Sequence, residues 1–268
     1  MIEQNADAMR AYSASNGTRA PRWRAAPAHI RLGRGEVHVW LVDLDGDPPA
    51  AGRPAMLEDA LSADERARAS RLRSEPLRRR FVAGRIAMRS ILGRYPGVGA
   101  PRDLQFAYGP HGRPSLVERN GPHFNFTRSG PLALCAVART PAVGVDVECV
   151  RAIPEAASIT RQYFSAREQA ALASLDMPPE SAMFQQAFYD AWTRKEAFIK
   201  ALGLGLAQPL DAFSVTLLPG QRPRLLEVPT GRPSAWTLRA FSPAAGYQAA
   251  LAIRARGVTL RFWRWSAD

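Results

Sequence analysis

Two carboxylates lie one residue apart in the segment VGVDVECV (143–150). Valines alternate with them, which predicts a strand whose valines face a core while Asp146 and Glu148 share the opposite face. Adjacent carboxylates repel and raise each other's pKa unless a cation joins them. An edge strand with its polar face in water is the simpler alternative, but the apolar surroundings of the pair favour a cation site.

A second segment, AWTRKEAFIK (191–200), holds the only two lysines of a chain that otherwise uses arginine. On a helix, Trp192, Glu196 and Lys200 fall on one stripe, and Glu196 lies at the margin of a buried face. An ordinary Glu–Lys pair four residues apart is the alternative. Arginine would serve such a pair equally well, whereas lysine offers a compact charge that can also move a proton, so Lys195 and Lys200 indicate a phosphate-handling site.

Three acids, Asp146, Glu148 and Glu196, could together hold a hard divalent cation. Mg²⁺ prefers oxygen ligands and usually keeps water or substrate phosphate in its coordination shell. With Lys200 and several arginines nearby, the set predicts a site for a substrate that carries a pyrophosphate.

The surrounding elements predict an α+β fold. Strands are expected over 36–44, over three segments between 123 and 150, and again in the tail after residue 212. Helices are expected from Ser62, from the region after Pro76 to Gly93, and over about 155–175 and 180–202. Residues 1–35 read as a disordered Arg-rich extension, 36–140 as an N-terminal α+β half, and 141–268 as a C-terminal α+β half that carries the metal site.

A faint internal repeat supports two halves. The segments 123–138 and 235–253 each combine a strand, a Ser/Pro/Gly turn and an Ala-rich apolar strand. Each follows an aromatic and basic helix that ends in glycine, at Gly93 and at Gly203. The pattern predicts a duplicated fold.

Composition limits the partners and the compartment. A net charge of +12 favours anionic partners such as nucleic acid, a phosphorylated molecule, an acidic protein or an anionic membrane surface. Cys135 and Cys149 make no disulfide framework, and no apolar run approaches the roughly 20 residues that span a bilayer. A cytoplasmic protein without a membrane partner is expected.

Two of these segments resemble the paired signatures of the Sfp-type 4′-phosphopantetheinyl transferases in their W-KEA form. The signatures stand here as GVDVE (144–148) and WTRKEAFIKALG (192–203). The Arg-rich helix RRRFVAGR (78–85), the loop GPHGRPSL (109–116) and the strand FNFTRSG (124–130) match as well. The resemblance covers residues 36 to about 255, which is most of the chain.

The resemblance implies a pseudo-dimer of two α+β halves with coenzyme A, the substrate, bound in the cleft between them. The implied reaction moves the phosphopantetheine arm onto a serine of an apo acyl or peptidyl carrier protein and releases adenosine 3′,5′-bisphosphate. The W-KEA form is typical of enzymes that serve non-ribosomal peptide and polyketide synthases. An acidic carrier domain would suit the basic chain, and two halves in one chain make a monomer sufficient.

The resemblance also implies roles for single residues in the metal site. Asp146, Glu148 and Glu196 would bind Mg²⁺, or Mn²⁺ in its place, with Asp146, Glu196 and Lys200 as the catalytic set. Glu196, or a water on the metal, would deprotonate the carrier serine. Lys200 would contact the phosphates, with Lys195 nearby.

Further residues would contact coenzyme A. Arg80 matches the ligand of the 3′-phosphate, Arg113 a basic residue near the adenine nucleotide, and Arg68 another basic contact. Thr127 keeps the hydroxyl of the family's F-N-x-S-H-S motif, whereas Arg128 replaces its histidine. Arginine carries a permanent charge, so binding should persist without the pH dependence of that histidine.

Two other functions are consistent with parts of the pattern. A metal-dependent nuclease or other DNA-binding protein would also use carboxylates, lysine and a basic surface. Glu148 is followed by Cys149, however, so the E-x-K continuation common in such nucleases is missing, and nucleic acid is not the expected partner. A non-catalytic module that binds coenzyme A or a nucleotide would leave the three acids unexplained.

Overall fold

The computed structural model describes residues 20–46, 61–118 and 121–266. The chain divides into two units, each with its own sheet and core. The C-terminal unit contains Ala142–Val258, and the N-terminal unit contains Arg22–Pro141 together with the segment that begins at Thr259.

In the N-terminal unit, a five-stranded sheet has the order β1-β12-β2-β6-β5. Its strands are β1 (Arg24–Ala25), β2 (Glu36–Asp43), β5 (His123–Ser129), β6 (Leu132–Ala138) and β12 (Thr259–Arg264). The helices α3 (Ala63–Ser70) and α4 (Glu75–Gly93) follow β2, and a short ladder joins β3 (Phe106–Tyr108) to β4 (Pro114–Leu116).

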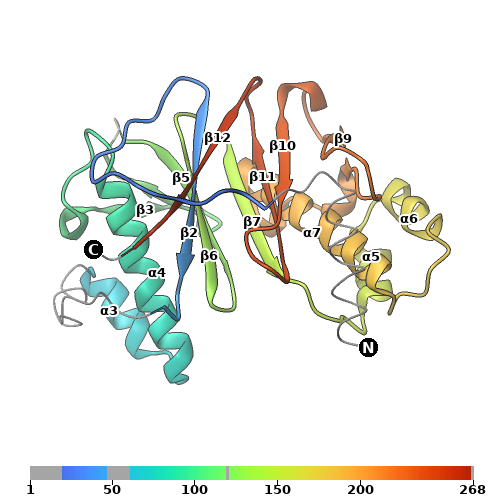
Figure 1. Ribbon diagram of the computed structural model, residues 1–268, viewed down its shortest axis with the longest axis horizontal. Helices are drawn as coiled ribbons and strands as arrows, with labels where there is room; N and C mark the ends of the chain where they lie inside the picture. Colours follow the sequence, from blue (N-terminus) through green and yellow to red (C-terminus); the bar gives the residue numbers. More distant parts are fainter. Residues whose placement is uncertain (1–19, 47–60, 119–120, 267–268) are drawn as a thin grey trace. The chain divides into compact units, whose positions relative to one another are not determined.

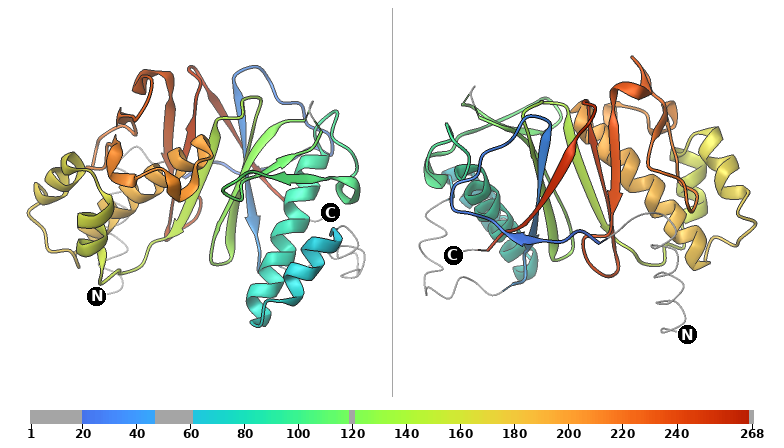
Figure 2. Two further views of the ribbon diagram at one scale, coloured as in Figure 1. Left: turned by 180° about the vertical axis from the view of Figure 1, so that it is seen from behind. Right: turned by 45° about the horizontal axis from the view of Figure 1, so that its top comes forward.

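One face of α4 forms the core of this unit. Met88, Ile91 and Leu92 of α4 pack with Trp40 of β2 and Val137 of β6. Figures 1 and 2 show α4 lying along the sheet. The expected start of α3 is confirmed: Ser62 and Glu65 form a capping box, in which each side chain bonds the backbone N–H of the other residue.

In the C-terminal unit, a three-stranded antiparallel sheet has the order β10-β11-β7. Its strands are β7 (Val143–Cys149), β10 (Thr237–Phe241) and β11 (Tyr247–Ile253). The helices are α5 (Ala156–Tyr163), α6 (Ala166–Ala173) and α7 (Ala182–Leu202), and β8 (Ser214–Val215) pairs with β9 (Leu225–Glu227). The long helix α7 contacts all three strands of the sheet.

The duplicated α+β fold is confirmed by strand order. In each unit a first strand is followed by helices and then by a hairpin, and the second hairpin strand pairs antiparallel with the first strand. The order β2-β6-β5 thereby repeats as β7-β11-β10. In each unit, one helix covers one apolar face of a three-stranded segment of sheet. The same arrangement can therefore form twice in one chain.

Two expectations about the ends of the chain are corrected. Residues 20–35 are not a disordered extension: β1 pairs with β12, and Ile30 and Leu32 are buried in the core. Residues 1–19 lie outside the described residues. The last strand, β12, was expected in the C-terminal half, but it pairs in parallel with β2 and so completes the N-terminal sheet.

Within the described residues, no helix is both long enough and apolar enough to cross a membrane. Both cysteines are free thiols, with Cys135 buried in the core of the N-terminal unit.

Candidate active site

The strand β7 holds two of the expected acids at the end of the C-terminal sheet. Its valines are fully buried, and Asp146 and Glu148 occupy the alternate positions, as the sequence predicted. Asp146 is only 2% exposed and Glu148 is half-buried. The simpler alternative was an edge strand with a hydrated polar face. The strand β7 does lie at the edge of its three-stranded sheet, but Asp146 on its polar face is buried rather than hydrated.

Gly144 lets α7 approach β7 directly. A Cβ atom at this position would lie 2.2 Å from the carbonyl oxygen of Ala197 and 2.4 Å from the amide nitrogen of Ala201. Both are backbone atoms of α7, so no side-chain rotation could make room. The glycine of GVDVE therefore sets the distance between the strand that carries Asp146 and the helix that carries Glu196 and Lys200.

Lys200 forms an ion pair across this contact. Its Nζ lies 2.5 Å from Oδ1 of Asp146, with the lysine side chain 28% exposed and the carboxylate buried. A buried carboxylate is costly unless an opposite charge lies close to it. Lys200 therefore stabilises Asp146 and still reaches the surface.

Glu196 lies within electrostatic range of both β7 acids. Burial raises the pKa of Glu196, Lys200 opposes that shift, and the charges of Asp146 and Glu148 raise the pKa further. The three carboxylates therefore repel one another, and a divalent cation bound between them would reduce that repulsion.

The donor types fit Mg²⁺, because all three are carboxylates, which supply the oxygen ligands that this ion prefers. The side chains are not arranged as a ready-made cluster, however. In the parts of the chain that the structure describes, no three or more His, Cys, Asp or Glu side chains stand close enough together to hold a metal ion. Binding a metal would require Asp146, Glu148 and Glu196 to turn toward one another.

Lys195 has a different role from the expected one. Its side chain is 0% exposed, and Nζ donates to Oε2 of Glu168 at 2.6 Å and to the carbonyl oxygen of Phe213 at 2.8 Å. The ammonium also lies 4.3 Å from the centre of the Phe213 ring. Glu168 in turn accepts from the backbone N–H of Val215. Lys195 therefore ties α7 to α6 and to the start of β8, and the expected phosphate contact is corrected.

The expected contacts for the nucleotide lie in the N-terminal unit. Arg80 on α4 makes a two-point contact with the carboxylate of Asp45, at 2.7 and 2.5 Å. Arg113 donates to the carbonyl oxygen of Pro141 at 2.8 Å, and burial lowers the pKa of its guanidinium. Arg68 on α3 is exposed, with its guanidinium carbon 5.5 Å from the centre of the Phe81 ring.

Thr127 and Arg128 are neighbours on β5 and so face opposite sides of the sheet. Thr127 is buried and Arg128 is exposed. The Thr127 hydroxyl, which matches the family motif, therefore points to the opposite side of the sheet from Arg128, which replaces the motif's histidine.

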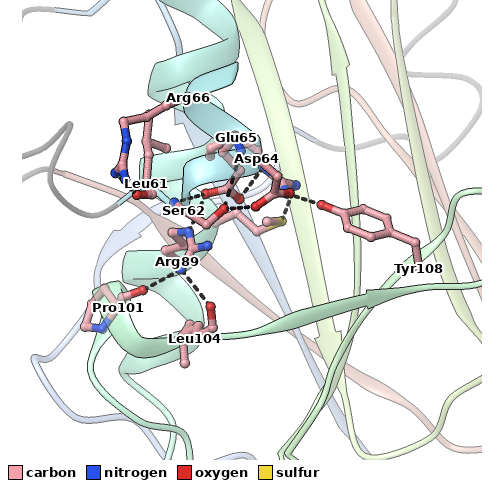
Figure 3. A network of polar contacts seen from close by, with 11 residues as sticks. Leu61, Ser62, Asp64, Glu65, Arg66, Arg89, Pro101, Leu104 and Tyr108 are labelled. Atoms are coloured by element: carbon pink, nitrogen blue, oxygen red, sulfur yellow. Dashed lines mark hydrogen bonds and ion pairs between the residues drawn. The ribbon is translucent and has the colours of Figure 1, made fainter. Parts of the chain in front are cut away.

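A buried ion network positions the two helices that carry Arg68 and Arg80. Glu65 of α3 forms ion pairs with both Arg85 and Arg89 of α4, at 2.7 and 2.8 Å. Arg89 also donates to the carbonyl oxygens of Pro101 and Leu104, as Figure 3 shows. Because Glu65 and Arg89 are buried and paired, α3, α4 and the loop after α4 are held together as one body.

Within the C-terminal unit, the structure thus pairs Lys200 with Asp146 and places Glu196 within electrostatic range of Asp146 and Glu148. Sequence reasoning missed the roles of Gly144 and Glu168. A glycine inside a strand marks a close backbone approach, and Ser165 with Glu168 three residues later marks a capping box, which the structure contains. Both signals are visible in the sequence, but neither predicts which segment the residue contacts: α7 for Gly144 and Lys195 for Glu168.

Comparison with known proteins identifies the family. Residues 142–252 match the sequence model of the ACPS family, described as the 4′-phosphopantetheinyl transferase superfamily. The 4′-phosphopantetheinyl transferase HetI of Nostoc sp. (strain PCC 7120) is 37% identical over 249 residues, which is 91% of this chain and 98% of HetI. The chain belongs to the 4′-phosphopantetheinyl transferase superfamily.

Other relatives are similar over shorter stretches. The 4′-phosphopantetheinyl transferase Sfp of Bacillus subtilis (strain 168) is 31% identical over 157 residues, covering 59% of this chain and 66% of Sfp. A putative 4′-phosphopantetheinyl transferase of Synechocystis sp. is 34% identical over 175 residues, covering 65% of this chain and 67% of the relative. The transferase is therefore an enzyme that uses coenzyme A and acts on carrier proteins. The nuclease alternative finds no support.

Proposed function

We propose that the transferase moves the phosphopantetheine arm of coenzyme A onto a carrier serine in a magnesium-dependent reaction at Asp146, Glu148 and Glu196. One observation carries the assignment of the site: two strand acids raise the pKa of one helix acid, and Lys200 pairs with one of the strand acids. Mutually repelling carboxylates offer the oxygen ligands that a hard cation prefers. When bound, Mg²⁺ or Mn²⁺ would neutralise charge on the diphosphate of coenzyme A.

Glu196 acts as the base in this proposal. Its pKa is raised by burial and by the neighbouring acids, so its carboxylate holds a proton more tightly than an ordinary glutamate. The carboxylate takes the proton of the carrier serine while the serine oxygen bonds to the phosphorus that bears the pantetheine arm. The bond from that phosphorus to the bridging oxygen breaks, and adenosine 3′,5′-bisphosphate leaves with the electron pair.

Lys200 stabilises the charge that develops on the leaving phosphate. Its ammonium is partly exposed, so it can contact a phosphate oxygen without being drawn out of the protein. Asp146 holds the lysine in place before the substrate binds. The Lys200 side chain thus lies between the buried Asp146 carboxylate and the leaving phosphate.

We assign the nucleotide end of coenzyme A to the N-terminal unit. Arg80 would bind the 3′-phosphate by exchanging the Asp45 carboxylate for a phosphate of similar geometry. Arg113 and Arg68 would add positive charge near the adenine nucleotide. Thr127 would donate its hydroxyl to a phosphate, and Arg128 would supply a permanent charge.

We further propose an acidic acyl or peptidyl carrier of a non-ribosomal peptide or polyketide synthase as the partner. The net charge of +12 would speed association with an acidic carrier domain. A monomer would suffice. The two free thiols suit a reducing compartment, and we propose the cytoplasm.

The experiment is transfer to an apo carrier protein followed by mass spectrometry. With coenzyme A and Mg²⁺, the carrier should gain the mass of one phosphopantetheine arm, and the gain should disappear with chelator and return with Mg²⁺ or Mn²⁺. Glu196→Gln should abolish transfer, while Glu155→Gln, an exposed acid of the same unit, should keep it. Near-normal turnover of Glu196→Gln would show that the proposed base and metal ligand is wrong.

A further inference from the structure

The N-terminal unit contains a cavity of about 300 Å³ at the β12 side of its sheet. We call it the β12 pocket. It is formed by the segment before β2, the first residues of β2 and the strand β12. Its charged lining consists of Arg22, Arg24, Arg31, Arg261, Glu36 and, where protonated, His38. A volume of this size lies at the lower end of the range for small-molecule sites.

Positive charge exceeds negative charge in this pocket. Glu36 is the only acid in its lining among the described residues, and it is already engaged: its carboxylate pairs with Arg261 at 2.9 Å and accepts from the backbone N–H of Gly33 at 3.0 Å. Arg261 is the main cause of the lowered pKa of Glu36. The charges of Arg22, Arg24 and Arg31 therefore remain for an anion.

One lining residue, His38, is held by hydrogen bonds on both sides of its ring. Nδ1 of His38 lies 2.9 Å from the Tyr95 hydroxyl, which also accepts the indole N–H of Trp40. Nε2 of His38 faces the Glu36 carboxylate at 3.5 Å. Burial lowers the pKa of His38. The His38 ring is therefore positioned beside Glu36 by contacts within the unit.

Apolar and aromatic side chains complete the lining. Phe262 and Trp263 of β12 contribute, with Ile30 and Leu260. The indole nitrogen of Trp263 is buried and has no hydrogen-bond partner among the described residues.

The pocket is separate from Thr127, one of the expected coenzyme A contacts of the same unit. In the register of the sheet, Thr127 on β5 aligns through Leu134 with Leu41, near the end of β2. The pocket instead lies at Glu36 and at the start of β2, on the side of β12. Because β5 is at one edge of the sheet and β1 is at the other, Thr127 and the pocket lie at opposite edges.

We propose that the β12 pocket binds a small organic anion, a phosphate or carboxylate attached to a planar or apolar body. The three arginines provide the charge for the anionic group, and Trp263, on the same side of β12 as Arg261, provides a surface for the body. Binding is independent of the transfer reaction, so a failure of the proposed metal site would leave this inference untouched.

Isothermal titration of the full chain with 1-naphthyl phosphate tests the proposal, with 1-naphthoate and inorganic phosphate as comparison probes. We expect one molecule to bind in the absence and in the presence of saturating coenzyme A, at least about tenfold more tightly than inorganic phosphate. The two naphthyl probes then distinguish a phosphate site from a carboxylate site. Displacement of the naphthyl probe by coenzyme A would overturn the proposal.

Variants test whether the arginines of the pocket are responsible. The double variant Arg22→Gln/Arg31→Gln should weaken binding of the naphthyl probe at least about tenfold, since hydrogen bonds to charged groups are the stronger ones. Both side chains are exposed, so the fold should survive, and the thermal midpoint verifies it. The matched control is Arg102→Gln, which is 77% exposed in the same unit and outside the pocket lining. Equal affinity in the double variant and the control would refute the proposal.

Discussion

Replacement of Gly144 by alanine tests how closely the site depends on the contact between β7 and α7. The added methyl group would lie 2.2 Å from the Ala197 carbonyl oxygen and 2.9 Å from the carbonyl carbon of Lys200. Ordinary van der Waals contact begins at 3.4 Å. The helix must therefore retreat by about 1 Å, because backbone atoms in a packed interior cannot rotate away.

The size of the effect follows from this displacement. Overpacking of a well-packed interior costs about 1–3 kcal/mol in the free energy of unfolding. Glu196 and Lys200 move with α7 while Asp146 stays on β7, and a misplacement of about 1 Å at a reacting centre can reduce the rate about 100-fold. We expect Gly144→Ala to lower kcat/KM for carrier modification by that order.

The assay compares kcat/KM and chemical unfolding for Gly144→Ala with those for Gly99→Ala. Gly99 is a suitable control because an added Cβ would meet nothing within 4 Å. We expect the control to behave like the wild type, and a Gly144→Ala protein that is folded but slow would locate the defect in the site. If Gly144→Ala had wild-type stability and kcat/KM, the close approach of α7 would not govern the site, and the reasoning would be refuted.

Three further predictions follow from buried or partly buried charges. Lys195→Met should lower the free energy of unfolding by about 3–5 kcal/mol, because it leaves the Glu168 carboxylate buried without the Lys195 ammonium. In urea titrations, the double variant Lys195→Met/Glu168→Gln should recover part of that loss. Lys200→Gln should raise KM for coenzyme A while destabilising the fold less than Lys195→Met does, because Lys200 is partly exposed beside Asp146; a larger loss of stability would contradict this. The pKa of His38 is lower in the folded chain than its ordinary 6.5, so the unfolded chain takes up the proton first as the pH falls and stability declines below that value. His38→Gln should reduce the loss of stability between about pH 7 and pH 5, and an unchanged pH dependence would exclude His38 as its source.

Local patterns in the sequence were sufficient for the elements that carry the site. The alternation of valines with Asp146 and Glu148 predicted β7, and the helical spacing around Glu196 predicted α7. The repeated order of strand, helix and hairpin was also visible, because each half must cover one apolar sheet face with one amphipathic helix. These features depend on residues that are close together in the sequence, so they can be predicted without knowing the tertiary structure.

The separation of the two lysines illustrates a signal that was available but insufficient. Five residues on a helix correspond to a rotation of roughly 140° between side chains, so Lys195 and Lys200 cannot share one stripe. Helical geometry alone therefore predicts different surroundings for them. Which lysine meets the acids of β7 depends on the face that α7 turns to the sheet, and Gly144 fixes that face.

Long-range pairing was decided only by the tertiary structure. The strand β12 joins β2 although more than 200 residues separate Arg261 from Glu36, and no local pattern specifies such a partner. Residues 20–35, for which composition alone predicted disorder, supply β1 to this sheet and bury Ile30 and Leu32 in the core. The sequence by itself determined the elements that carry Asp146, Glu148 and Glu196, because strands and helices follow from residue types and short spacings. Tertiary packing decided which charges neutralise one another, since burial and distance between remote segments exist only in the folded chain.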